Sequence, residues 1–354
     1  MPVNQPDFVL QIATPFSTGT GCYLPQFNLV VTNEHIVRDN PTVLVAGKGM
    51  EKQLMKVVYL DAYYDLAFLR PESPLAAGQL NLQPVLPTVG DTVMALGHNY
   101  GQRRQESTGE VTDPQRVLHD INYIQHTARL ESAQSGGPLI GAQGELLGIN
   151  MYDIDEGHQL ALSLPAIILL DCVQEFVTGE GKGPVRCFEC GKLSFENPNE
   201  ETKYCTNCGT AITLPNDVPE YQPSGVQATV EQIVIEAGHD PRMARRGPNL
   251  WEIAQGSARI QIAYHEDSGL VTGDAHLCLV PDDHPASLFE YLLRQNCELE
   301  HLTFSTRGRD IILSLLIYDR YLSAETALPQ FQHLFKMADR YDDLLVDEYQ
   351  AMPL

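Results

Sequence analysis

Short apolar runs separated by glycine, proline and asparagine dominate the first half of the chain. The runs predicted to be β-strands are Phe8–Ile12, Cys22–Leu24, Leu29–Thr32, Thr42–Val45, Leu66–Leu69, Thr92–Leu96 and Leu146–Ile149. Helical periodicity is nearly absent until residues 165–177. Many short strands with frequent turns predict a β-barrel or a β-sandwich.

The last third of the chain mixes helical and strand patterns. Helices are predicted where apolar residues recur at helical spacing, in the set Val226, Val230, Ile233, Val234 and Ala237 and in the set Phe331, Leu334, Phe335, Ala338, Tyr341 and Leu345. Another is predicted to start at residues 282–285 and to bury Leu288, Phe289, Leu292 and Leu293. The predicted strands are Leu250–Ala254, Arg259–Tyr264, Leu277–Val280, Leu299–Phe304 and Ile311–Tyr318. This order predicts an α+β domain with helices packed on an antiparallel sheet.

Changes of composition divide the chain into segments. We expect a strand-rich domain over residues 1–180, a small cysteine-bearing segment over 181–215, a linker over 216–225 and the α+β domain over 226–354. The length of 354 residues suffices for two or three domains with their own cores.

The charge balance narrows the classes of partner. A net charge of −23 repels phosphate backbones and anionic lipid, so we expect neither nucleic acid nor membrane as a partner. The first seven residues do not resemble a signal peptide, and no apolar stretch is long enough to span a membrane. A cytoplasmic location follows as the expectation, with reduced thiols. We predict that Cys22, Cys172, Cys278 and Cys297 are small buried residues.

The other four cysteines form two CxxC pairs, each followed by glycine: Cys187 with Cys190, and Cys205 with Cys208. This spacing is typical of a zinc site and resembles a zinc ribbon. Because four thiolates would fill the coordination sphere, the Zn²⁺ is expected to be structural rather than catalytic. For this segment we expect a spacer or docking role rather than nucleic-acid binding, because nearby glutamates offset its basic residues. The paired spacing also argues against a redox function of the CxxC pairs.

One stretch carries the candidate chemistry, Ser135-Gly136-Gly137-Pro138-Leu139-Ile140. Two glycines leave open space beside the hydroxyl, and the apolar run after Pro138 is typical of a buried strand. A serine held on such a turn suits a nucleophile, although plain loops leading into strands also contain Ser-Gly-Gly. His35 and Asp65 precede it, in the order His, Asp, Ser.

Residues 5–178 resemble the chymotrypsin-like serine peptidases of the HtrA type. The motifs that carry the resemblance are Gly19–Tyr23, Val31–Val37, Asp65–Leu69, Ser135–Leu139 and Gly144–Asn150, in the family's order and spacing. The resemblance implies an all-β double barrel of two six-stranded antiparallel barrels, with the site in the cleft between them.

The resemblance also implies roles for single residues. His35 would accept the proton of Ser135, and Asp65 would orient the imidazole. The backbone N–H groups of Ala133 and Ser135 would form the oxyanion hole. The family usually carries glycine where this chain has Ala133, so either alanine fits or the hole is misformed at rest.

The same resemblance places Arg129, Leu162 and Ser163 around the primary specificity pocket. If Arg129 points inward, an acidic substrate side chain is favoured through a charge-assisted pair. If it points to solvent or pairs with Glu131, the pocket is apolar and takes small or medium side chains.

Residues 226–354 resemble the YbjN and type III secretion chaperone-like group, on the stretches 287–296 and 338–345. This implies protein binding, through a protein partner or a homodimer; the alternative is an inert stabilising appendage. The sequence therefore predicts a serine endopeptidase acting on protein or peptide substrates. The alternative is a silent or partner-activated interaction module on a peptidase fold.

Overall fold

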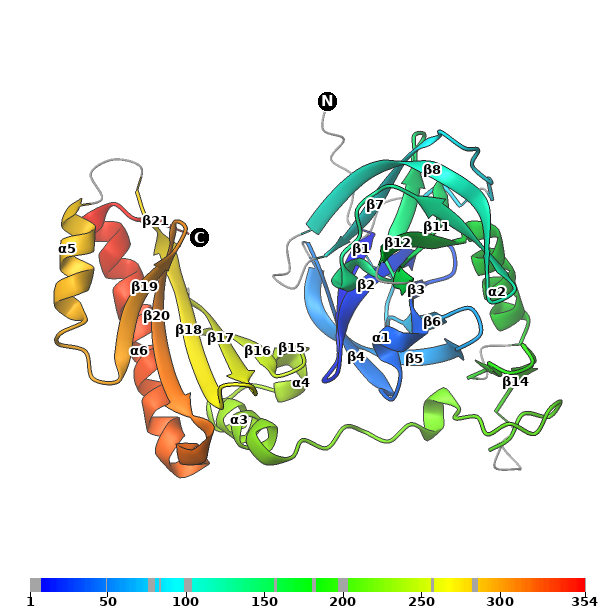
Figure 1. The fold of residues 1–354 in the computed structure, drawn as a ribbon. Coiled ribbons are helices and arrows are strands. Elements are labelled where there is room, and N and C mark those ends of the chain that lie inside the picture. Colours follow the sequence, from blue (N-terminus) through cyan, green and yellow to red (C-terminus); the bar gives the residue numbers. More distant parts are fainter. Residues whose placement is uncertain are drawn as a thin grey trace. The chain divides into compact units, whose positions relative to one another are not determined.

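The computed structural model describes residues 8–48, 50–75, 80–82, 84–98, 104–155, 158–179, 183–196, 203–255, 258–281 and 286–353. The chain divides into two compact units, residues 1–221 and 222–354, and each is taken by itself (Figure 1). Among the described residues no helix is both long and apolar enough to cross a membrane.

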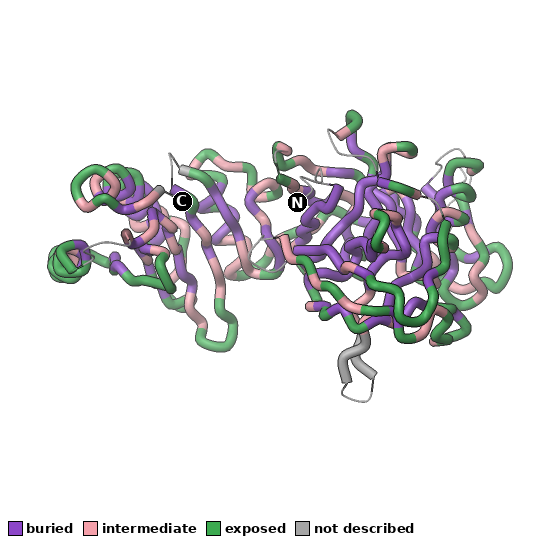
Figure 2. The backbone as a smooth tube through the Cα atoms, turned by 90° about the horizontal axis from the view of Figure 1, so that it is seen from above, coloured by how far each residue is buried: buried purple, intermediate pink, exposed green. Residues whose placement is uncertain are grey.

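The first barrel of the first unit is built from six strands. They are β1 (Val9–Ala13), β2 (Thr18–Leu24), β3 (Leu29–Thr32), β4 (Thr42–Gly47), β5 (Met50–Asp61) and β6 (Leu66–Arg70). Their order is β5-β4-β1-β2-β3-β6, and pairing of β5 with β6 closes the ring. Strands β1 to β3 are buried along their whole length, and exposed residues gather at the loops (Figure 2).

A second barrel follows in the same unit. Its strands are β7 (Thr92–His98), β8 (Arg104–Leu118), β9 (Ile121–His126), β10 (Pro138–Gly141), β11 (Leu146–Asp155) and β12 (His158–Pro165), closed in the order β10-β11-β12-β9-β8-β7. The prediction of two six-stranded antiparallel barrels is confirmed. Because both rings of strands are closed, neither barrel leaves a free sheet edge where its ends meet.

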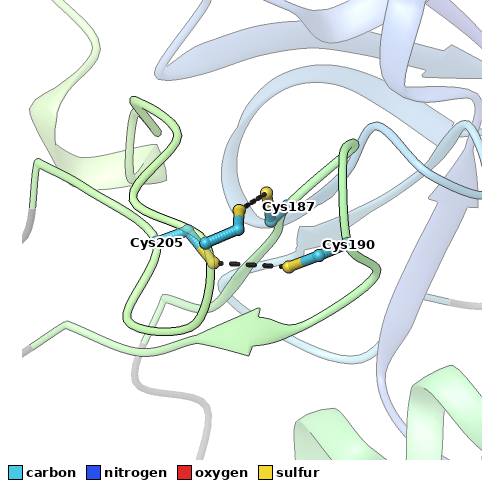
Figure 3. A group of neighbouring side chains, drawn as sticks. Cys187, Cys190 and Cys205 are labelled. Carbon is cyan, nitrogen blue, oxygen red and sulfur yellow. Dashed lines mark hydrogen bonds between the residues drawn. The ribbon is translucent and has the colours of Figure 1, made fainter.

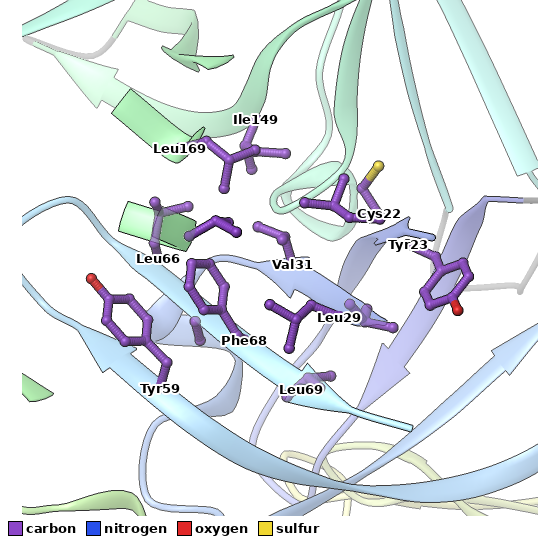
Figure 4. Close-up of a cluster of buried hydrophobic side chains, with 14 of the residues drawn as sticks. Cys22, Tyr23, Leu29, Val31, Tyr59, Leu66, Phe68, Leu69, Ile149 and Leu169 are labelled. Atoms are coloured by element: carbon purple, nitrogen blue, oxygen red, sulfur yellow. The ribbon is translucent and has the colours of Figure 1, made fainter. Parts of the chain in front are cut away.

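A helix after the second barrel, α2 (Ala166–Thr178), packs on the core of the first. Figure 4 shows Leu169 of this helix among Leu66, Phe68 and Ile149. The Phe176 ring meets the Phe68 ring edge-on, with centroids 5.6 Å apart. The predicted helix over 165–177 is therefore present, and its apolar face joins side chains of both barrels in one core.

The cysteine-bearing segment extends the first barrel's sheet. Strand β13 (Val185–Arg186) pairs in parallel with the end of β5, and β14 (Leu193–Ser194) pairs with β13. The segment expected as a linker begins with a 3₁₀ helix, Pro215–Asp217, beside which Leu214 and Val218 are buried. Residues 180–182, at the predicted boundary between the strand-rich domain and the cysteine-bearing segment, lie outside the described residues.

The second unit is an antiparallel sheet with helices. Its elements are α3 (Gly225–Glu236), α4 (Pro241–Ala244), β15 (Arg245–Gly247), β16 (Leu250–Gln255), β17 (Ala258–His265), β18 (Leu270–Leu279), α5 (Ala286–Gln295), β19 (Leu302–Arg307), β20 (Asp310–Tyr318), α6 (Ala324–Tyr349) and β21 (Met352–Pro353). The strand order is β15-β16-β17-β18-β20-β19, with β21 beside β18. Helix α6 buries the apolar face that the sequence predicts for it.

Two burial predictions for this unit were wrong, and one strand was predicted too short. Cys297, which was expected to be buried, is exposed. The strand expected over Leu277–Val280 is the end of the longer β18, whose first half contains Gly273 and polar residues. Glycine is needed there because a Cβ at Gly273 would lie 2.7 Å from the Phe331 ring. In α5 only Leu288 and Leu292 are buried, whereas Phe289 and Leu293 are exposed, so the buried stripe is narrower than predicted. The predicted start of this helix, residues 282–285, lies outside the described residues.

Candidate active site

His35 and Asp65 meet at one end of the first barrel. His35 lies in the short helix α1 (Glu34–Val37), which follows β3 directly, and Asp65 ends the turn between β5 and β6. The His35 Nδ1 lies 2.8 Å from one Asp65 carboxylate oxygen, and the His35 backbone N–H donates to the other at 3.0 Å. Because both oxygens are used, the carboxylate is fixed, and Nδ1 carries a proton that it donates to Asp65. The Nε2 lone pair of His35 is then left to act as a base.

The turn that carries Asp65 is itself held in place. Asp65 adopts φ +52°, a left-handed conformation in which aspartate is more common than most residues. Its backbone carbonyl accepts a hydrogen bond from the Asn33 side-chain amide at 2.9 Å. Asp61, at the other end of the same turn, accepts the Tyr64 N–H at 2.9 Å. The position of the Asp65 carboxylate thus follows from the end of β5.

Asp61 is also the partner of a buried arginine. Its carboxylate is fully buried and accepts from Arg186 Nε at 2.7 Å. The same guanidinium donates to Glu175 of α2 and, at 3.0 Å, to the Gly191 carbonyl beside Cys190. Arg186 therefore connects the cysteine-bearing segment with the strand that leads to Asp65.

Ser135 lies on the loop that leads into β10. It follows a 3₁₀ helix, Ser132–Gln134, and precedes Gly136, whose φ is +83°. A Cβ at Gly136 would come within 2.1 Å of the Thr20 carbonyl oxygen, so only glycine fits there. The Thr20 N–H donates to the Ser135 carbonyl at 2.9 Å, and the Thr20 hydroxyl donates to the Ala133 carbonyl at 2.8 Å. The candidate nucleophile is thereby tied to β2 of the first barrel.

The Ser135 hydroxyl accepts a hydrogen bond from the Tyr152 backbone N–H at 3.1 Å. Among the hydrogen bonds of the described residues, none joins this hydroxyl to His35. The side chain of His35 is 40% exposed, whereas Ser135 is 2% exposed. A hydroxyl that accepts one bond keeps its own proton to donate, so the contact with Tyr152 leaves transfer to His35 open.

The expected oxyanion donors belong to a closed turn. The Ser135 N–H donates to the Ser132 carbonyl at 3.1 Å, and the Gln134 N–H donates to the Glu131 carbonyl at 2.9 Å. The side chains of Glu131 and Gln134 close the turn reciprocally with backbone N–H groups. In this form the Ser132 carbonyl, rather than a substrate oxygen, takes the Ser135 N–H.

Of the three residues predicted for the specificity pocket, only Arg129 lines a pocket in the structure. This pocket lies in the second barrel, and its lining also includes Ala161, which precedes Leu162 in the chain. Leu162 and Ser163 are fully buried, and the pocket lining does not include them. Ser163 instead donates to the Asn150 side chain at 2.9 Å.

His126 is a pocket residue that the sequence did not single out. Its Nε2 lies 3.1 Å from the Ser163 hydroxyl, and burial lowers the pKa of His126 to about 4. It is therefore uncharged near neutral pH. The sequence offered no usable signal for it, because β9, the strand that His126 ends, was not predicted either.

The four cysteines of the CxxC pairs converge. Their Sγ atoms all lie within 4.8 Å of one another, with Cys187 3.6 Å from Cys208 and Cys190 3.6 Å from Cys205 (Figure 3). Four sulfurs about 2.3 Å from one tetrahedral ion would be about 3.8 Å apart, so the cluster fits zinc.

The loops around the cysteines are built alike. Gly191 and Gly209 follow the two pairs with φ of +65° and +77°, and each N–H donates to the first cysteine's carbonyl at 2.9 Å. Hydrogen bonds from the backbone N–H groups of Cys208 and Asn207 lower the pKa of Cys205 to about 6. A thiol that ionises readily is a good metal ligand.

Comparisons with known proteins match part of this chain, and the family model places its match within the first unit. Residues 19–149 match the family model described as the trypsin-like peptidase domain. The mitochondrial serine protease HTRA2 of Bos taurus is 29% identical over 157 residues, covering 42% of this chain and 34% of that protein. The serine endoprotease DegS of Escherichia coli K12 is 30% identical over 151 residues, covering 40% of this chain and 41% of that protein. The chain thus spans about two fifths or less of the length of these relatives.

Solved structures align with about half of this chain. A serine endoprotease from Yersinia pestis aligns with a TM-score of 0.44 and 23% identity, over 50% of this chain and 65% of that one. The MamO protease domain of Magnetospirillum magneticum aligns with a TM-score of 0.42 and 23% identity, over 47% and 95%. The family and sequence comparisons support a serine endopeptidase.

Proposed function

We propose that the first unit hydrolyses peptide bonds in proteins or peptides through Ser135, His35 and Asp65. The observation that carries this proposal is the fixed His35–Asp65 pair, which leaves the His35 Nε2 as a base. The trypsin-like match over residues 19–149 supports it independently, because that segment contains all three side chains.

The reaction needs two proton transfers in each half. His35 Nε2 takes the Ser135 proton while Oγ bonds to the scissile carbonyl carbon, and the carbonyl oxygen becomes negative. His35 then gives its proton to the leaving amine as the C–N bond breaks, which leaves an acyl group on Ser135. Water, deprotonated by His35, attacks this ester, and the proton returns to Ser135 as the acid leaves. Asp65 keeps the charged imidazole oriented throughout.

The described turn at Ser132–Ser135 suggests a resting form. Stabilisation of the oxyanion requires N–H groups that point to the substrate, a contribution of roughly 3–4 kcal/mol per donor in a comparable site. Since the Ser135 N–H donates to Ser132, we propose that substrate or a partner must open this turn. This combines the peptidase with the alternative function, a module that is silent until a partner engages it.

A fluorophosphonate probe, which bonds to an activated serine, tests the proposal. We expect labelling of the full chain that is lost in Ser135→Ala and strongly slowed in Asp65→Asn. Serine replacements elsewhere, such as Ser268→Ala on the second unit, serve as the matched control. If the probe fails to label the folded chain even with a broad peptide mixture present, the silent-module alternative holds.

We further propose that Cys187, Cys190, Cys205 and Cys208 bind one structural Zn²⁺. The fit of the four sulfurs to a tetrahedral ion supports this. A zinc bound there would be closed to substrate, and its binding free energy would stabilise a segment too small to bury a core of its own. Metal analysis of the purified chain should find about one zinc per molecule, and none after Cys205→Ser.

The second unit is proposed to bind protein, either a partner or a second copy. The exposed apolar side chains Leu316 and Tyr318, two residues apart on β20 and so on one face of the sheet, support a docking role. Analytical ultracentrifugation of the full chain distinguishes a homodimer from a monomer that awaits a partner.

A further inference from the structure

A pocket of about 340 Å³ lies next to the candidate nucleophile. Its lining includes His126, Thr127, Arg129, Leu130, Tyr152 and Ala161. Tyr152 connects the pocket with Ser135, because its backbone N–H donates to the Ser135 hydroxyl. The volume lies within the range of small-ligand sites, so one substrate side chain could occupy it.

The charge of this pocket comes from one residue. Arg129 is exposed, and its guanidinium makes neither an ion pair nor a hydrogen bond with the described part of the chain; only its backbone N–H is bonded, to Ser107 at 2.7 Å. Glu131, the acidic neighbour two residues away, is occupied in closing the turn with Gln134. An arginine without a carboxylate partner is unexpected in a chain with a net charge of −23.

The other titratable residue of the pocket adds no charge. His126 is 4% exposed and stays neutral near pH 7, since burial lowers its pKa to about 4. It is held by Ser163, which is held in turn by Asn150. Asn150 donates to the Pro138 carbonyl at 3.1 Å, and its backbone N–H donates to Gly137 at 2.7 Å. The inner wall is therefore rigid, uncharged and linked to the loop that carries Ser135.

We infer that this pocket accepts an acidic substrate side chain, glutamate or aspartate, through Arg129. The inference rests on the proposed peptidase function. The sequence left open a pocket for an acidic side chain and an apolar pocket for small or medium side chains. The structure favours the acidic preference, because Arg129 lines the pocket and Glu131 does not neutralise it. A carboxylate in the pocket would pair with the guanidinium, while the apolar stem packs on Leu130 and Ala161.

Matched fluorogenic tetrapeptides that differ only in the residue before the scissile bond provide the test. Glutamate should be preferred over glutamine by about fivefold or more in kcat/KM, a modest factor because Arg129 is exposed. The preference should vanish in Arg129→Met and reverse in favour of lysine in Arg129→Glu. Arg116→Met, which removes an exposed arginine at the far end of β8, should leave it unchanged.

Binding separates this inference from the peptidase proposal. Ser135→Ala cannot form the acyl-enzyme, so the affinity of the same peptides for this variant reports the pocket alone. Stronger binding of the glutamate peptide, lost with Arg129→Met, supports the inference even if the wild type cleaves nothing. Equal binding of glutamate and glutamine peptides, or cleavage after leucine that ignores Arg129, overturns it, while such cleavage would leave the peptidase proposal standing.

Discussion

Replacement of Ala133 by glycine should activate the chain. The N–H of Ala133 can turn toward a substrate only if the peptide between Ser132 and Ala133 rotates. The described 3₁₀ turn resembles a type I turn, and the rotated form resembles a type II turn. That change carries the φ of the second central residue from about −90° to about +80°.

The magnitude follows from the cost of positive φ. An L-residue in the left-handed region costs roughly 1–2 kcal/mol, whereas glycine adopts it freely. Ala133 has no positive φ at rest, so the substitution stabilises the rotated form relative to the closed one. At 1.4 kcal/mol per factor of ten, the gain is about 5- to 30-fold in the population of the open turn.

The assay is the rate of fluorophosphonate labelling, together with kcat/KM on a peptide substrate. Both should rise by this factor in Ala133→Gly and disappear when Ser135→Ala is added. Ala95→Gly removes an equally buried methyl group from the wall of the second barrel and should leave the rate unchanged. Rates for Ala133→Gly within twofold of the wild type would show that the turn does not limit activity.

Three further predictions concern stability. Lowering the pH from 7 to 4.5 should reduce the free energy of unfolding of the first unit by about 2 kcal/mol through His126. The reason is that the unfolded histidine binds a proton below pH 6.5, whereas the buried one does so only near its pKa of about 4. Urea unfolding of His126→Gln should not show this loss. Arg186→Met should lower the free energy of unfolding by roughly 3–5 kcal/mol, because it leaves the buried Asp61 carboxylate without its cation. Arg294→Met, which removes an exposed arginine, should lower it by less than about 1 kcal/mol in the same urea unfolding experiment. A chelator should lower the melting temperature of the wild type but not of Cys205→Ser, and Cys297→Ser should behave like the wild type.

The sequence was informative where function depends on local motifs. The contact of His35 with Asp65 was expected from the resemblance to the HtrA-type peptidases, whereas the convergence of the CxxC pairs was expected from their spacing alone. Strands β5 and β8 were missed because they are long and partly exposed, so neither shows the compact apolar run of a buried strand.

The pocket could not be deduced in the same way. The role of His126 depends on Ser163, 37 residues away, and burial sets its charge. Whether the Arg129 guanidinium has an acidic partner depends on the Glu131 carboxylate, which instead caps the 3₁₀ turn. Such properties arise from packing between strands that are distant in the chain, and no spacing rule encodes them.

The buried pair of Arg186 and Asp61 bears on where the peptidase part ends. A fragment cut after residue 180 would retain every strand of both barrels and all three candidate catalytic side chains. It would nonetheless lose the cation that neutralises a fully buried carboxylate four residues before Asp65. The smallest fragment that folds by itself is therefore expected to include the cysteine loops, and a chain that lacks them is expected to need an uncharged residue in place of Asp61.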